Sequence, residues 1–571
     1  MLKDFSKHKL SHLKLILIGV LFFALLSGCE IIAPVEDVPN DIEDTSQVVL
    51  ANATPTRGGS INISMRNPST LNPILNEDVT VQSVLSLVFE YLFVIDDTLM
   101  PTPNLIRTAS FSDDGMSVEL SIKDDIVWSD GELFTPQDIA FTIDLIRANP
   151  TSLYHGTIST IASHSIVDNS TIRINFNQNS NGLGYAFLFP VLPRHYYAGQ
   201  AASALRQMQP LGNGPFVFDT LTLAREMALL RNPLAFRPPY IDNVRVLITP
   251  DENTDFYAKE INIIDVLEIE ATERGRFSAV ILGLYINVVP RHYFDFMLFN
   301  FNNPLIGDIR VREAIYMSFL SEHTISTVYQ LPIGRATSPI NPRSWLYEEN
   351  KRELPADSFE DAFFAANFEV IDEHGTLGNL VAGVPAPLSF RILVNYENQI
   401  RLDLANILRQ NLENVGIAVN FKALDFEEYT QELENKNFDI AFAGVILPPK
   451  PSLDFLFEVS NYTSQELDNH RARVQDAPNR REFEQALRAL QTYMAHNLPI
   501  ISIAFRDNLL LTGIDIKGEI APGLGNIFQN VDKWFMRSDS DTIQSDSDAD
   551  QSDSDADRSD SDATQSDSDA N

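Results

Sequence analysis

The chain has 571 residues, of which 44% are hydrophobic, and its formal net charge at pH 7 is −36. This length is enough to bury a large core and suggests about three domains of ~150 residues each. The strongly negative charge argues against a nucleic acid as partner, because the phosphates would be repelled.

The first residues have the pattern of a secretory signal. Four lysines precede an almost wholly apolar run from Leu15 to Leu26, which matches the charged and apolar regions of a signal peptide. The run is too short to span a bilayer as a helix, which needs ~20 residues. An N-terminal membrane anchor and a buried helix are the alternatives.

The single cysteine of the chain, Cys29, ends the stretch Leu26-Ser27-Gly28-Cys29. This stretch resembles a bacterial lipobox, whose cysteine becomes the lipid-modified first residue of the mature protein. We therefore expect residues 1–28 to be a lipoprotein signal peptide and Cys29 to carry the lipid that holds the protein on the membrane. No second apolar run approaches ~18 residues, so we expect no spanning helix.

Both ends of the mature chain differ in composition from its middle. Residues 29–57 are rich in Pro, Asp, Glu, Thr and Asn and predict a lipidated N-terminus with a flexible linker. Residues 538–571 repeat Ser-Asp units and resemble the Ser-Asp stalks of some bacterial surface proteins. Such a segment cannot bury enough surface to offset its ordering entropy, so we expect a disordered tail. A calcium loop at Asp546–Asp550 is the alternative, although it lacks the glycine and glutamate of an EF-hand.

The middle of the chain mixes strand and helix patterns. Alternating apolar residues predict strands at 60–65 and 117–122. Thr135 followed by Pro136 and Asp138 predicts the start of a helix, as in a capping box.

A helix followed by a strand is predicted further along the chain. Leu404, Leu408 and Leu412 form one apolar stripe, Gly416 is placed to end the helix, and residues 417–421 then alternate as a strand. A helix that leads into a strand predicts an α/β fold with sheets flanked by helices.

Several ordered motifs carry a resemblance to one family. They are "PSTLNPILNEDVTVQSVLSLVFEYL", "VELSIKDDIVWSDGELFTPQDIAFTIDLI", "LGNGPFVF", "FNFNNPLIGDIRVREAIYMSF", "ATSPINPRSW" and "FDIAFAG". Each motif alone is weak, but the ordered set extends over nearly the whole globular part, roughly 58–534. The chain in this respect resembles the extracellular solute-binding proteins of family 5, the peptide- and nickel-binding group.

The resemblance implies a fold and a domain organisation. The fold would be a two-lobed α/β clamshell like that of periplasmic binding proteins, with an additional satellite domain and mixed sheets flanked by helices. The expected segments are 58–88, 195–290 and 500–536 for lobe I, 89–194 for its satellite domain, and 291–499 for lobe II.

The resemblance also implies a function. The protein would be the substrate-binding lipoprotein of an ABC importer, with a peptide-like solute in the cleft between the lobes. An ABC permease and ATPase subunits would be its partners, and it would lie outside the cytoplasm, lipid-anchored at the cell surface or in the periplasm. The alternatives are the same fold binding an oligosaccharide or a metal chelate, and a surface adhesion protein suggested by the tail.

Candidate ligand contacts follow from the resemblance. Val79, in "DVTV", lies where family members run an extended segment beside a bound peptide. Gly444, Val445 and Ile446 lie where the second lobe offers the opposite extended segment. Two extended segments would let a peptide add as a strand through its main chain.

Two further positions are candidates. Trp345 lies where the family places aromatic side chains near the ligand, with core packing as the alternative. Peptide-binding members have an aspartate for the ligand's α-amine where this chain has Pro448, which offers neither a carboxylate nor an N–H. Asp454 or Glu458 could replace that aspartate only if the loop is rebuilt, so recognition of a free N-terminus is in doubt.

Catalytic and metal-binding motifs are lacking in the sequence. The ten histidines form no His-x-x-x-His or His-Glu-x-x-His pair, and Gly-x-Ser-x-Gly and a nucleotide-binding P-loop are also absent. We therefore expect no enzyme activity, no cofactor and no metal site.

Overall fold

The computed structural model of the protein describes residues 54–278, 280, 283–319, 322–329, 335–350, 358–451, 453 and 461–537. These residues belong to one compact unit of the chain, residues 53–571. The predicted signal peptide, Cys29, most of the linker, Asp454, Glu458 and the Ser-Asp tail lie outside the described residues.

A four-stranded sheet contains the first strand of the described chain. Its order is β1 (Ser60–Met65), β10 (Asn243–Ile248), β9 (Glu226–Arg231) and β8 (Phe216–Thr222), with β1 parallel to β10. Ile61, Ile63 and Met65 are buried on one face of β1, so the predicted strand at 60–65 is confirmed.

A second four-stranded sheet is antiparallel throughout. Its order is β4 (Ile106–Phe111), β5 (Ser117–Ile122), β7 (Thr171–Phe176) and β6 (Ile161–Ile166). Helix α4 (Pro136–Arg147) packs against β6 and β7. The Asp138 carboxylate accepts the Thr135 N–H at 2.8 Å, so the predicted helix start is confirmed together with the strand at 117–122.

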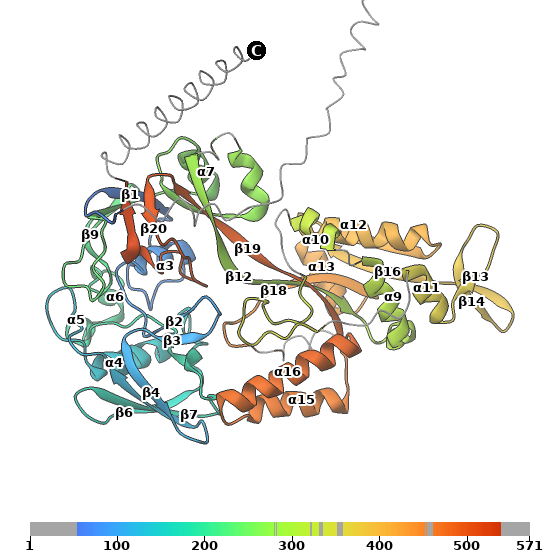
Figure 1. Ribbon diagram of the computed structural model, residues 1–571, viewed down its shortest axis with the longest axis horizontal. Helices are drawn as coiled ribbons and strands as arrows, with labels where there is room; N and C mark the ends of the chain where they lie inside the picture. Colours follow the sequence, from blue (N-terminus) through green and yellow to red (C-terminus); the bar gives the residue numbers. More distant parts are fainter. Residues whose placement is uncertain are drawn as a thin grey trace, which may run out of the picture. The chain divides into compact units, whose positions relative to one another are not determined.

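The largest sheet has six strands (Figure 1). Their order is β11 (Val266–Glu270), β19 (Ile500–Gly513), β12 (Leu284–Phe299), β18 (Ile440–Ile446), β16 (Ser389–Asn395) and β17 (Ala418–Leu424). Helix α12 (Gln399–Asn414) connects the parallel strands β16 and β17. Leu404, Leu408 and Leu412 are buried, and Gly416 has φ +78°, so the predicted helix, its glycine stop and the strand after it are confirmed.

The long antiparallel strands β12 and β19 run side by side through this sheet (Figure 1). Their pairing breaks between Val289 and Tyr293, where Pro290, Arg291 and His292 lie opposite Asp507. Strand β12 extends across the predicted boundary between lobe I and lobe II, whereas β19 lies wholly within a segment predicted as lobe I. The precise lobe boundaries stay a prediction.

The remaining elements are shorter or lie around these sheets. The other strands are β2 (Phe93–Ile95), β3 (Pro101–Pro103), β13 (Glu369–Val370), β14 (Leu377–Val381), β15 (Val384–Pro387), β20 (Ile516–Gly518) and β21 (Trp534–Met536). The other α-helices are α3 (Val79–Leu85), α5 (Arg194–Tyr197), α6 (Ala202–Leu205), α7 (Glu252–Glu260), α8 (Pro304–Gly307), α9 (Ile309–Phe319), α10 (Glu322–Tyr329), α11 (Phe359–Ala365), α13 (Phe426–Glu434), α15 (Gln465–Asp476) and α16 (Arg480–Asn497). The 3₁₀ helices are η2 (Gly184–Phe187), η3 (Ala271–Phe277) and η5 (Val531–Lys533). Within the described part of the chain, no helix has the length and apolar character needed to cross a membrane.

The two faces of the six-stranded sheet carry separate apolar clusters. Leu404 and Ile440 belong to the cluster that α12 covers. Phe294, Phe505 and Leu487 belong to the cluster on the other face, together with α16 and residues near β2. Because neighbouring residues of a strand point to opposite faces, each of β12 and β19 contributes to both clusters.

Helix α7 contains a buried lysine. Lys259 is 1% exposed, and its Nζ donates to the main-chain oxygen of Asp265 at 2.7 Å. Burial lowers the pKa of Lys259 to about 8, against the opposing effect of the Asp265 charge. An unfolded lysine titrates near ~10.4, so between these two pH values the unfolded chain binds more protons than the folded one.

We predict that Lys259 raises the free energy of unfolding of the unmutated (parent) protein as pH rises from 8 to about 10. Stability increases with pH wherever the unfolded state binds more protons than the folded state. The full contribution is ~3 kcal/mol, from a pKa difference of more than two units. Urea unfolding of the parent and Lys259→Met, at pH 7 to 10, checks it. The difference in free energy of unfolding between the parent and Lys259→Met should change with pH. The control Lys533→Met removes an exposed lysine paired with Glu519, and its free energy of unfolding should depend on pH as that of the parent does.

Candidate functional site

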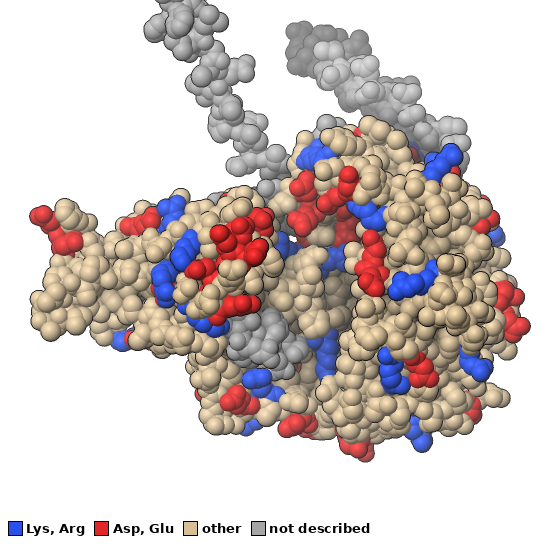
Figure 2. Space-filling model, turned by 180° about the vertical axis from the view of Figure 1, so that it is seen from behind, with Lys and Arg blue, Asp and Glu red and all other residues tan. Residues whose placement is uncertain are grey.

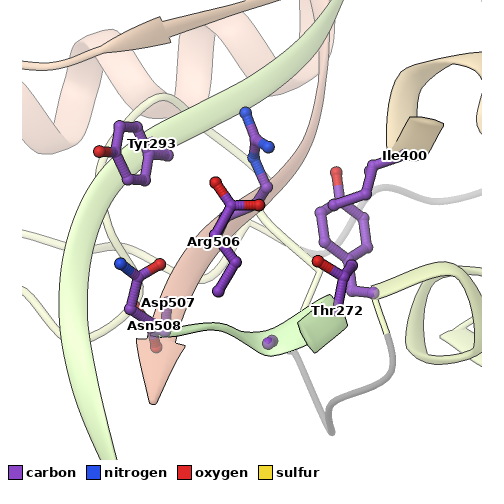
Figure 3. A pocket seen from close by; sticks show the side chains of 9 residues that line it. Thr272, Tyr293, Ile400, Arg506, Asp507 and Asn508 are labelled. Atoms are coloured by element: carbon purple, nitrogen blue, oxygen red, sulfur yellow. The ribbon is translucent and has the colours of Figure 1, made fainter. Parts of the chain in front are cut away.

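A pocket lies beside the long paired strands β12 and β19, which are called the crossing strands below. About 310 Å³ of space not filled by atoms, open solvent included, lies between its lining residues. Its lining comes from the segments predicted as lobe I and lobe II and from both strands: Glu270, Ala271, Thr272, Tyr293, Tyr329, Ile400, Arg506, Asp507 and Asn508. Arg506 lies between Tyr293 and Ile400 in the close view (Figure 3). The pocket therefore lies where both predicted lobes meet the crossing strands.

A buried carboxylate lies next to two of the residues that line this pocket, Tyr329 and Arg506. Asp295 on β12 is 0% exposed. Arg401 Nε lies 2.9 Å from its Oδ1, and Arg506 Nε lies 3.0 Å from its Oδ2. The Tyr329 hydroxyl donates to the same Oδ2 at 2.9 Å. The cluster thus brings together α12, β19, β12 and α10, which are far apart in sequence.

Burial, and then the charge of Asp295, raise the pKa of Tyr329 well above its ordinary value. Tyr329 therefore stays a neutral hydrogen-bond donor at physiological pH. Asp295 supplies one negative charge and the two arginines supply two positive charges, so the cluster has an excess of one positive charge. In the described part of the chain, no second acidic side chain pairs with Arg401 or Arg506.

The arginine side chains keep some access to solvent, with exposures of 17% for Arg401 and 18% for Arg506. Each ion pair uses Nε, and the terminal nitrogens make no further hydrogen bond to the described residues. Arginine nitrogens are well suited to bind a carboxylate with two parallel hydrogen bonds. A hollowed face of the molecule also shows Lys or Arg atoms inside the hollow (Figure 2). The arrangement can accept an anionic group.

The break in strand pairing beside this pocket is held by polar contacts. The Arg291 N–H donates to Asp507 Oδ1 at 3.1 Å, and Arg343 Nη2 donates to Asp507 Oδ2 at 3.1 Å. Burial raises the pKa of Asp507, although the charge of Arg343 opposes that effect. Asn508 Nδ2 and Arg291 Nε both donate to Glu268 Oε1, at 2.6 and 2.7 Å. The irregular segment is thus fixed to both β11 and β19.

The predicted extended segment Gly444–Ile446 lies in strand β18. β18 pairs with β12 along its whole length but with β16 only at Ile440 and Ala441. The Leu447 N–H donates to His292 O, and main-chain groups alternate in direction along an antiparallel strand. Gly444 and Ile446 therefore turn their main-chain groups away from β12, toward the edge that β16 leaves uncovered.

Gly444 also touches the charged cluster. A Cβ at this position would collide with the guanidinium of Arg401 and the carboxylate of Asp295. Only glycine leaves room for the ion pair to lie against the strand. The structure therefore places Gly444 beside the cluster, whereas its role in ligand binding stays a prediction.

The predicted extended conformation around Val79 is wrong. Val79 is 70% exposed and begins helix α3, with Asp78 as its N-cap. The Asp78 carboxylate accepts the N–H groups of Thr80 and Val81, at 2.8 and 3.1 Å. Those two donors are therefore not available to a peptide strand, although Val79 itself could still touch a ligand by its side chain.

Trp345 lies apart from the pocket beside β12 and β19. Its main-chain N–H donates to Thr98 O at 2.9 Å, and the Arg480 guanidinium lies 4.5 Å from its ring centre. It packs against the apolar cluster that contains Tyr185 and Phe505. The structure thus places Trp345 between residues of the predicted satellite domain and of lobe II, and its contact with a ligand stays a prediction.

Pro448 lines a different pocket from the one beside Arg506, together with His292, Leu447 and Phe505. Asp454, the proposed replacement for an amine-binding aspartate, lies outside the described residues. Within the described chain, no group of three or more His, Cys, Asp or Glu side chains could hold a metal ion.

Sequence reasoning missed Asp295, Arg401 and Arg506. A signal existed for two of them, because Asp295 stands inside "FDFMLF" and Arg506 inside "ISIAFRDNLLL". A charged residue within an apolar strand pattern must find a partner or a functional role. Arg401 gave no such signal, since arginine is ordinary in the first turns of an amphipathic helix.

Comparisons with known proteins agree with this architecture. The model of the family described as "Bacterial extracellular solute-binding proteins, family 5 Middle" matches residues 100–465, more than half of the chain. The oligopeptide-binding protein AppA of Bacillus subtilis is 20% identical over 522 residues, which cover 84% of this chain and 92% of AppA.

Solved structures share the fold. The ABC transporter substrate-binding protein CtaP of Listeria monocytogenes has a TM-score of 0.69 at 19% identity, covering 85% of this chain and 100% of CtaP. NikZ of Campylobacter jejuni, in complex with Ni(L-His), has a TM-score of 0.60 at 20% identity, covering 84% of this chain and 100% of NikZ. The predicted two-lobed α/β fold is thus confirmed. The chain belongs to the bacterial extracellular solute-binding proteins of family 5.

Proposed function

We propose that this chain is the substrate-binding lipoprotein of an ABC importer and captures a peptide-like solute between its lobes for delivery to a membrane permease. Family membership and the name of AppA, an oligopeptide-binding protein, support this function. The lipobox-like stretch ending at Cys29 supports the anchor. ATPase subunits on the cytoplasmic side would supply the energy.

The observation that carries the proposal is the pair of arginines beside the pocket, whose lining also contains the carboxylates of Glu270 and Asp507. Two arginines share the single carboxylate of Asp295, and a charge that is partly desolvated needs a partner. A solute with a carboxylate would supply that partner. Both peptides and metal chelates carry carboxylates, whereas a neutral oligosaccharide carries none.

A metal chelate is the second candidate solute. NikZ is described with Ni(L-His), and another solved member of similar fold is described as a periplasmic EDTA-binding protein. Pro448 removes the expected partner of a peptide's amine, which also favours a solute without a free N-terminus. Against this, the uncovered main-chain edge at Gly444 and Ile446 suits a peptide backbone.

We predict that a free carboxylate on the solute contributes strongly to affinity. A library of short peptides is first screened by thermal shift, and a hit is then compared with its C-terminal amide by calorimetry. Removing one partner of a buried, hydrogen-bonded ion pair costs ~3–5 kcal/mol, so amidation should weaken binding by a hundredfold or more. Arg506→Gln should weaken the free acid by a similar factor and leave the affinity of the amide nearly unchanged.

The matched control is Arg409→Gln, which removes an arginine of α12 that pairs with Glu413 on the same helix. This variant should bind the free acid like the parent. Equal affinities of acid and amide for the parent protein would refute the carboxylate contact. Hits among metal chelates and none among peptides would transfer the proposal to the chelate.

A peptide's amine should contribute little. Because proline offers neither carboxylate nor N–H at position 448, an N-acetylated peptide should bind within about threefold of the free form, well under the tenfold that ~1.4 kcal/mol represents. Calorimetry on matched pairs decides this. A loss of a hundredfold on acetylation would mean that an acid reaches the amine, and Asp454→Asn would then be expected to reproduce the loss.

Cys29 should anchor the protein. Stable membrane binding needs more than one acyl chain, and the lipobox-like stretch provides the residue on which they would be assembled. We predict that Cys29→Ser either releases the protein from the membrane or leaves it unprocessed with its signal attached. Cell fractionation and the mass of the mature chain test this, and a mutant that is processed, lipidated and membrane-bound like the parent would contradict it.

A further inference from the structure

A second pocket lies on the other face of the crossing strands. About 350 Å³ of space not filled by atoms, open solvent included, lies between its lining residues. His292 on β12 and Phe505 on β19 line it, whereas their sequence neighbours Tyr293 and Arg506 line the pocket described above. Because adjacent residues of a strand point to opposite faces, the two pockets lie on opposite faces of the same pair of strands.

The walls of this second pocket are nearly all apolar. Leu99, Ile340 and Leu447 line it together with four prolines, at positions 339, 448, 449 and 451. Among the described residues, no acidic side chain belongs to its lining, so a cationic group would find no charge partner in that part of the chain, which is costly in an apolar site. The pocket therefore suits an uncharged group with a large apolar surface.

One polar side chain in the pocket has unused hydrogen-bonding capacity. Both ring nitrogens of His292 are buried and find no hydrogen-bond partner among the described residues. Burial lowers the pKa of His292, while the nearby main-chain groups of Pro448 and Leu447 oppose that effect. The ring is therefore neutral at pH 7, with one nitrogen as donor and the other as acceptor.

The other polar side chains of the lining each have at least one hydrogen bond within the chain. Asn341 Nδ2 donates to Arg291 O at 3.2 Å, and its Oδ1 accepts the Arg343 N–H at 3.0 Å. The Ser344 hydroxyl oxygen accepts the Leu346 N–H at 3.2 Å. The main-chain oxygens near His292 can only accept, so they favour the tautomer whose N–H points toward them. A neutral ring that turns its N–H toward these oxygens keeps its other nitrogen as an acceptor, and no described residue donates to that nitrogen.

We propose that this pocket is a subsite for an uncharged aromatic side chain that carries a hydrogen-bond donor, a phenol or an indole, with His292 as the acceptor. This inference rests on the proposed function, because the aromatic group would belong to the captured solute. Aromatic rings bury a large apolar surface and keep one polar handle. Proline rings and the Phe505 ring supply flat apolar walls for such a group.

The position of the pocket fits a peptide-like solute. Strand β18 ends at Ile446, and the pocket begins with the next residue, Leu447. A peptide along the uncovered edge of β18 would present alternate side chains to the two faces of the sheet. One face carries Arg401 and Arg506, and the other carries His292. In a bound peptide, the residue next to the one whose charged group meets the arginines would therefore place its side chain in the subsite, and that side chain should be aromatic.

The test uses small probes that need neither a carboxylate nor a known solute. N-acetyl-tyrosinamide, N-acetyl-phenylalaninamide and N-acetyl-lysinamide are titrated into the protein with isotope-labelled histidine, and ring signals are followed by NMR. The His292 signal is identified as the one that His292→Leu lacks. We expect tyrosinamide to shift this signal and to bind about fivefold more tightly than phenylalaninamide, as one net hydrogen bond of ~1 kcal/mol would give. Lysinamide should not bind.

Variants separate the hydrogen bond from a general effect on the fold. In His292→Leu, the preference for tyrosinamide over phenylalaninamide should disappear while both still bind. The matched control His470→Leu changes a histidine of α15 that packs on Tyr493 and should keep the preference. Thermal denaturation of each variant checks that it is folded.

Equal affinity for tyrosinamide and phenylalaninamide in the parent, or a preference that survives in His292→Leu, would overturn the subsite. Failure of all probes to shift the His292 signal would overturn it as well. The test of the solute carboxylate uses other ligands and the variant Arg506→Gln. A negative result for the aromatic subsite would therefore not change a positive result for the carboxylate contact. A positive result with these probes likewise does not depend on transport.

Discussion

A single buried carboxylate constrains the centre of this structure. Asp295 is fully buried on a strand that passes between the predicted lobes, and its two oxygens receive Arg401, Arg506 and Tyr329. A charge in this position without partners would cost several kcal/mol. The partners come from α12, β19 and α10, so correct placement of those elements and satisfaction of the carboxylate require each other.

The same interaction explains a residue choice and a binding property. A side chain at position 444 would displace the Arg401–Asp295 pair, because that pair lies against the strand where a Cβ would be. The second arginine leaves one positive charge in excess within a chain whose formal net charge is −36. Glu270 and Asp507 also line the pocket, so this positive charge is confined to the cluster of Asp295, Arg401 and Arg506, whose arginine nitrogens are suited to bind an anionic group.

Local patterns predicted much of the fold. The strands at 60–65 and 117–122, the helix that begins after Thr135 and the helix that ends at Gly416 were all predicted from periodicity and capping. These features depend on interactions within a few residues of the chain. The extended segment at Val79 was expected from the family resemblance instead, and it is wrong because Asp78 caps a helix there. An aspartate before a short apolar run is itself a local helix-start signal.

The candidate site could not be predicted from local patterns, because the residues that form it are far apart in the sequence. Arg401 and Asp295 are 106 residues apart, and no spacing rule connects them. The pocket beside Arg506 likewise combines Thr272 with Ile400. An isolated charge within an apolar strand could have marked Asp295 and Arg506 as notable, but its partner could only be found once the strands were paired.

The crossing strands contain an interruption that lies between the two pockets. Pairing between β12 and β19 is interrupted at Pro290–His292. This short segment divides the two-stranded ribbon that β12 and β19 form into a part next to β11 and a part next to β18. Tyr293 and Arg506 follow directly beyond the interruption and line one pocket, while His292 and Phe505 line the other. A rotation of one part of the ribbon against the other would alter the shape of both pockets. A solute that contacts residues on both sides of the interruption, such as Thr272 and Arg506, therefore binds one arrangement of the two parts better than the others and shifts the population toward it.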